Sequence, residues 1–195
     1  MQFTFAALIG AIRFTLRAPR DAARTVIGLR LSTSAGWTAL ALAAVASTLL
    51  SSLALQIVPV ELEPAVAAVF GNPLRLALLQ FGVLAVGAVL VFAVGRRLGG
   101  TGDLAGTLAV LSWLEVIQIA LQVVQLAVML VAPPVADVIG LAGVVLFFWL
   151  LSQFVAELHG VGSGWKVFGA VILTGFALSF ALAVLLVILG VSVHV

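Results

Sequence analysis

The chain has 195 residues, of which 64% are hydrophobic and 8% are charged, with a formal net charge of +2 and a mean hydropathy of +1.36. An ordinary soluble domain carries about 25% charged residues, and so few charges cannot cover the surface of a water-soluble domain of this size. The composition excludes a soluble globular protein and predicts an integral membrane protein whose outer surface faces hydrocarbon.

Residues 1–30 predict a basic amphipathic segment that lies in the membrane interface. Its arginines recur at intervals of three and four residues, so they share one helix face, opposite Ala11, Thr15, Ala22 and Val26. We expect the helix to be kinked near Pro19 and the arginines to contact anionic lipid headgroups. The alternative is a basic segment that sets topology and has no partner. The candidate headgroup residues are Arg13, Arg17, Arg20 and Arg24.

Residues 31–195 predict a domain of five transmembrane helices, because a span needs about 20 predominantly apolar residues. Stretches of this kind lie at about residues 36–58, 74–94, 104–131, 138–157 and 167–191. The expected fold class is therefore all-α, a polytopic helical bundle preceded by an interfacial helix. With the N-terminus inside, eight of the nine Lys and Arg residues lie on the cytoplasmic side and only Arg75 lies outside. The positive-inside rule thus predicts an N-inside, C-outside topology.

Small residues repeat every fourth position in the first and fifth spans. Such ridges allow close approach of helices, so we expect both spans to lie in the bundle interior or at a subunit interface, where the two ridges can pack against each other. The ridge of the first span consists of Ala35, Ala39, Ala43, Ser47 and Ser51, and that of the fifth of Gly175, Ser179 and Ala183.

The third span carries a polar stripe within an arc of roughly 80° at 100° per residue. The stripe consists of Thr107, Glu115, Gln118, Gln122 and Gln125. Because polar groups are costly in hydrocarbon, the stripe must face other helices or water. One interpretation is that Glu115 and the glutamines line a conducting or binding cavity. The other, which we favour, is that the stripe holds helices together by hydrogen bonds.

No catalytic, cofactor or metal site is predicted. The chain has no cysteine, and its two histidines, His159 and His194, are expected on opposite membrane faces. The glycine-rich strings at residues 100–105 and 160–166 lack the strand context or the Gly-Lys-Ser/Thr order of nucleotide-binding loops. Glu157 and His159 form a possible acid–base pair, but a solvated helix end is the preferred interpretation, because no nucleophile is nearby. We therefore expect no enzyme, no cofactor, no nucleotide site and no nucleic-acid partner.

Several short motifs resemble the bacterial branch of the Yip (Ypt-interacting protein) family. They are Arg-Ala-Pro at residues 17–19, Gly-Arg-Arg-Leu-Gly-Gly-Thr-Gly-Asp-Leu at 95–104, Trp149, Glu-Leu-His-Gly-Val at 157–161, and Trp-Lys at 165–166. The resemblance covers about residues 10–190. It implies a five-span membrane protein without catalytic activity.

The sequence therefore predicts a non-enzymatic multi-pass protein of the bacterial cytoplasmic (inner) membrane. We expect it to associate with anionic lipids and with other membrane proteins or itself, in membrane organisation or scaffolding. Two alternatives remain open. One is a small accessory subunit of a respiratory or photosynthetic membrane complex. The other is a transporter or channel that uses Glu115.

Overall fold

The computed structural model describes residues 4–57 and 71–188, with side chains in the last helix described as far as Phe176. All regular structure in these residues is α-helical. The helices are α1 (Phe5–Arg17), α2 (Pro19–Gly28), α3 (Thr33–Ile57), α5 (Pro73–Arg97), α6 (Leu104–Met129), α7 (Pro133–His159) and α8 (Gly164–Ile188).

The N-terminal segment forms two helices. Proline cannot donate a backbone hydrogen bond and disfavours helical geometry in the preceding residue, so α1 ends at Arg17 and α2 begins at Pro19. Ala18 between them has a φ of −139°. The predicted kink near Pro19 is thus a complete break. The Thr4 hydroxyl caps α1 by accepting the Ala7 N–H at 3.2 Å.

Four helices, α3, α5, α6 and α7, are long and apolar enough to cross a membrane. Their ends follow local capping signals. Asn72 accepts the N–H groups of Leu74 and Arg75 ahead of α5, and Asp103 accepts the Gly106 N–H at 2.7 Å ahead of α6. The helix predicted near residue 138 begins earlier, at Pro133, because proline is well tolerated in the first turn.

The predicted fifth span coincides with α8, which has 25 residues. The part of α8 whose side chains are described, Gly164–Phe176, is apolar but shorter than a full membrane span. Whether α8 crosses the membrane therefore stays a prediction. Parts of the predicted first and fifth spans, at residue 58 and after residue 188, lie outside the described residues.

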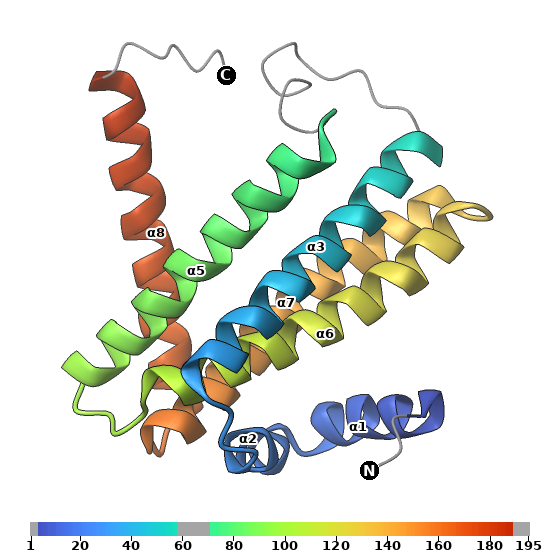
Figure 1. The fold of residues 1–195 in the computed structure, drawn as a ribbon. Coiled ribbons are helices and arrows are strands. Elements are labelled where there is room, and N and C mark those ends of the chain that lie inside the picture. Colours follow the sequence, from blue (N-terminus) through green and yellow to red (C-terminus); the bar gives the residue numbers. More distant parts are fainter. Residues whose placement is uncertain (1–3, 58–70, 189–195) are drawn as a thin grey trace.

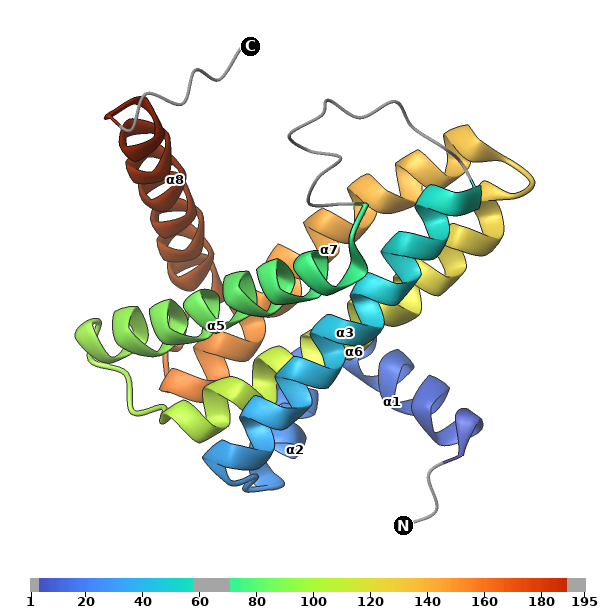
Figure 2. The same ribbon diagram turned by 45° about the horizontal axis from the view of Figure 1, so that its top comes forward.

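The bundle is built around α6 (Figure 1). In both views α3, α6 and α7 lie side by side, and α8 diverges from the others after contacting α7. The helix α5 runs alongside α3 in Figure 1 and lies at an angle to it in Figure 2. The two short helices lie at one end, where α2 packs against α6 and α7. We call this end, where α3, α6 and α8 begin and α5 and α7 end, the basic end.

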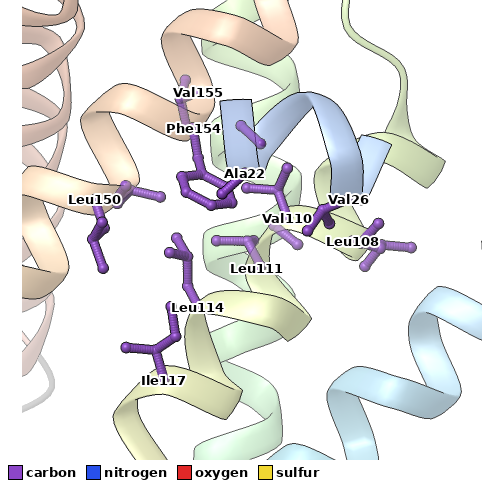
Figure 3. Close-up of a cluster of buried hydrophobic side chains, with 14 of the residues drawn as sticks. Ala22, Val26, Leu108, Val110, Leu111, Leu114, Ile117, Leu150, Phe154 and Val155 are labelled. Atoms are coloured by element: carbon purple, nitrogen blue, oxygen red, sulfur yellow. The ribbon is translucent and has the colours of Figure 1, made fainter. Parts of the chain in front are cut away.

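The hydrophobic core is concentrated near the basic end (Figure 3). Phe154 of α7 and Leu108 of α6 are fully buried, and Ala22 and Val26 of α2 pack into the same cluster. In contrast, α5 exposes much of its length, as a lipid-facing helix does. The short α2 is therefore part of the core.

Candidate functional site

An ion pair joins α2 to α7 at the basic end. Arg24 donates from Nε to Glu157 Oε1 at 2.6 Å and from Nη2 to Oε2 at 3.4 Å, and Nη1 lies 2.9 Å from Asp21 Oδ1. Glu157 is mostly buried, while Arg24 stays exposed. The hydrogen bond and charge of Glu157 raise the pKa of Arg24 above its ordinary value. The two-pronged contact fixes the orientation of α2.

Arg20 forms a second link to α7. Its Nε donates to Gln153 Oε1 at 3.0 Å, and its Nη2 donates to the Gly162 carbonyl at 3.0 Å, in the turn between α7 and α8. At Gly164 a Cβ would lie 2.6 Å from Gln153 Nε2, so glycine leaves room for this amide. The link therefore depends on the glycine-rich sequence of the turn.

The structure separates the four predicted headgroup arginines. Arg20 and Arg24 bind α7 and the following turn. Arg13 and Arg17 are exposed and, in the part of the chain that is described, make no hydrogen bond or ion pair. Only Arg13 and Arg17 are therefore fully available to a headgroup.

The first helix, α1, is held against α6 through a buried hydroxyl. Trp113 Nε1 donates to Thr15 Oγ1 at 3.0 Å, and that hydroxyl donates to the Ala11 carbonyl. Thr15, Ala22 and Val26, on the face expected opposite the arginines, are all buried. The outward side of α1 exposes large apolar side chains together with the two free arginines. The apolar side chains are Phe5, Phe14 and Leu16.

His159 is enclosed where the sequence predicted a solvated helix end. It is only 2% exposed, and a Cβ at Gly95, Gly100 or Gly102 would overlap its side chain. The Thr101 N–H donates to the His159 carbonyl at 3.3 Å. The solvated-end interpretation is therefore wrong for His159, because residues 95–102 fold over the ring. The glycines of residues 95–102 make room for the His159 side chain. Their presence therefore needs no bound nucleotide as an explanation.

The polar stripe of α6 is divided among several neighbours. Gln122 forms a hydrogen-bonded pair with Ser47 of α3, with contacts of 3.0 and 3.1 Å. Thr107 donates to the Asp103 carbonyl within its own helix. At Gly140 of α7 a Cβ would lie 2.7 Å from Gln125 Nε2. The Ser47–Gln122 pair is the kind of contact that the helix-holding interpretation expects.

A cavity of about 130 Å³ lies between α3 and α6 and is partly open to the outside. Gln122 and Gln125 line it, whereas Glu115 does not. The other lining residues are Leu50, Ser51, Ala54, Leu126 and Met129. The cavity interpretation therefore applies to the glutamines at the far end of the stripe.

The two small-residue ridges have different surroundings. In the ridge of α3, Ala43 and Ser47 are buried, and α3 packs on α6 and α5. Gly175 of α8 is exposed, and no heavy atom lies near the position of an added Cβ. The side chains of Ser179 and Ala183 lie outside the described part. In both views α5 lies between α8 and the distal part of α3.

Among residues 4–57 and 71–188, no three His, Asp or Glu side chains are close enough to hold a metal ion. His194, predicted on the face opposite His159, lies beyond the described residues.

The sequence was compared with models of known protein families. The family model of the Yip1 domain matches residues 14–186. The chain belongs to the Yip1 family. Yip1 proteins are non-enzymatic membrane proteins, and this member is a multi-pass helical one. The match spans both the basic end and the polar stripe of this Yip1 protein. No curated protein and no solved structure matches the chain significantly.

Proposed function

We propose that this Yip1 protein acts without catalysis, by associating with membrane lipids and with other membrane proteins or itself, to organise the membrane or scaffold partners within it. In this proposal it resides in the bacterial cytoplasmic membrane with five spans, its N-terminus inside and its C-terminus outside. The α1–α2 segment then lies on the cytoplasmic surface.

The exposed face of α1 is the observation that carries the proposal. Phe14 and Leu16 are exposed beside the free cations Arg13 and Arg17, while Thr15 anchors the opposite side of the helix to Trp113. A helix with outward apolar and basic groups is suited to the boundary between headgroups and acyl chains. Its fixed attachment to α6 couples that boundary to the bundle.

The distribution of cations supports the proposed orientation. Cations of α2, α5 and α8 gather at the basic end, whereas Arg75 begins α5 at the other end. Short cytoplasmic segments retain Lys and Arg. The cations of the basic end are Arg20, Arg24, Arg96, Arg97 and Lys166.

The test is isolation of the tagged full-length protein from its native membrane in mild detergent, with mass spectrometry of retained proteins and lipids. We expect anionic lipid to be enriched, and the double substitution R13Q/R17Q to reduce that enrichment several-fold. The matched control R96Q/R97Q removes two charges from the same end and should leave most of the enrichment.

Two outcomes would contradict the proposal. Equal lipid retention in both double variants would show that the arginines of α1 have no special role in binding anionic lipid. A protein partner recovered at fixed stoichiometry without anionic lipid would favour an accessory subunit of a larger complex.

A further inference from the structure

Glu115 lies on the side of α6 that faces α3. Leu108 and Gln122 are each seven residues from Glu115, two helical turns or about 10 Å along the axis, and so share its face. Leu108 fills the space beside Gly36 of α3, and Gln122 is bonded to Ser47 of α3. Glu115 therefore lies midway along the α3–α6 contact, where it is 6% exposed.

Among the described residues, this buried carboxyl group has no hydrogen-bonding or charged partner. In the described part of the chain, Glu115 makes no hydrogen bond and no ion pair. The facing helix α3 contains no ionisable residue, and Glu115 is the single one in α6. The ionisable groups of the other helices that contact α6 lie at the ends of α5 and α7 or on the short helices α1 and α2. They are Arg13 and Arg17 of α1, Arg20, Asp21 and Arg24 of α2, Arg75, Arg96 and Arg97 of α5, and Asp137, Glu157 and His159 of α7.

Two further unpaired oxygens flank Glu115 on α6. Ser112 and Gln118 lie one turn before and one turn after it, and residues three apart on a helix are neighbours. Ser112 Oγ and Gln118 Oε1 are both buried without a hydrogen-bond partner. A protonated carboxyl group can donate to the Gln118 oxygen and accept from the Ser112 hydroxyl. Adding one proton therefore allows Glu115 to donate to the neighbouring Gln118 oxygen, whereas a carboxylate would face that oxygen as a second acceptor.

A partly open cavity lies farther along the α3–α6 interface, beyond this group. The partly open cavity between α3 and α6 is lined by Gln125 and Ser51, and Gln122 lies at the same interface two turns from Glu115. Its volume of about 130 Å³ admits water, and its walls supply polar partners. The Ser47–Gln122 pair lies between the cavity and the carboxyl group.

We propose that Glu115, with Ser112 and Gln118, is a proton-binding site inside the membrane that is reached from the α3–α6 cavity past Gln122. A hydronium ion in the cavity transfers its proton along this route to a Glu115 carboxylate oxygen and leaves as water, and release reverses the step. This property goes beyond the proposed association with lipids and proteins, which needs no exchangeable proton.

The test uses the full-length protein in liposomes and dicyclohexylcarbodiimide, a hydrophobic reagent that attacks protonated carboxyl groups. Labelling is mapped by mass spectrometry over a range from about pH 5 to about pH 9. We expect Glu115 to be labelled at a rate that falls about tenfold or more across this range. Carboxyl groups at helix ends serve as internal controls for the labelling reaction. They belong to Asp103, Asp137 and Glu157.

The route is tested with cavity-filling variants. A54F and S51L place larger side chains in the cavity, and L53F is the matched control, because Leu53 is exposed on α3 and does not line it. After a pH jump, labelling of Glu115 should respond several-fold more slowly in A54F and S51L than in L53F. Each variant is first checked for an unchanged elution volume in detergent.

The results that overturn the proposal are distinct. No labelling of Glu115 at any pH excludes a protonated carboxyl group, and a rate independent of pH shows a permanently protonated structural residue. Equal responses in A54F, S51L and L53F overturn the route through the cavity.

Discussion

At the scale of single residues, the imidazole of His159 occupies space that side chains at Gly95, Gly100 and Gly102 would need. Gly99 has a φ of 85°, which favours glycine and turns the chain after α5. The α5–α6 connection is thereby closed over the end of α7. Glycine at these positions is required by packing and by backbone conformation.

The substitution G95A should destabilise the protein by about 1–3 kcal/mol, because its Cβ would overlap the His159 ring. The control G87A lies on the same helix, α5, where nothing is within 4 Å of the added Cβ. It should be neutral or slightly stabilising, since alanine favours helix more than glycine does. Thermal unfolding in detergent measures both. A melting temperature of G95A equal to that of G87A would show that His159 moves aside at no cost.

Some of these residues could be located from the sequence and others could not. The polar stripe follows helical periodicity, so the sequence alone places Glu115 and Gln122 on one side of their helix. The burial of His159 depends on the path of residues 98–103, which has no periodicity. The only available signal was the spacing of Gly95, Gly100 and Gly102.

At the scale of helices, α2 has ten residues, too few for stability in isolation, and is held by its contacts. Ala22 and Val26 supply buried apolar area, while Arg24 and Glu157 fix its direction. The break at Pro19 could be anticipated from proline chemistry. The docking of α2 on α7 could not, because the contacts of Arg24 and Arg20 join residues 133 or more positions apart.

Reversing the charge at Arg24 should loosen α2, because R24E places a third carboxylate beside those of Glu157 and Asp21. The double variant R24E/E157R should restore the attachment by exchanging the charges. The chain has no native cysteine, so spin labels at T25C and W165C report uniquely on this region. We expect a broadened distance distribution in R24E and a narrow one in the double variant. A narrow distribution in R24E would mean that apolar contacts alone hold α2.

At the scale of the whole molecule, packing is uneven along the bundle. Fully buried side chains such as Phe154, Leu150 and Leu108 gather near the basic end, whereas α5 and α8 separate from the other helices farther away (Figure 1). In a membrane, lipid chains cover apolar helix faces that no other helix covers. The number of spans and the distribution of charged residues between the two ends then determine the orientation of the bundle in the bilayer.

The proposed five-span topology predicts which loops face each side of the membrane. Three positions are suited to single cysteines: Thr101 between α5 and α6, Asp137 near the start of α7, and Val195, the last residue of the sequence. In intact cells a membrane-impermeant maleimide should label D137C and V195C, while T101C reacts only after the membrane is opened, because the positive-inside rule keeps the basic end in the cytoplasm. Labelling of D137C without V195C would show that α8 does not cross. Labelling of T101C in intact cells would invert the orientation and put the arginine face of α1 on the outer surface.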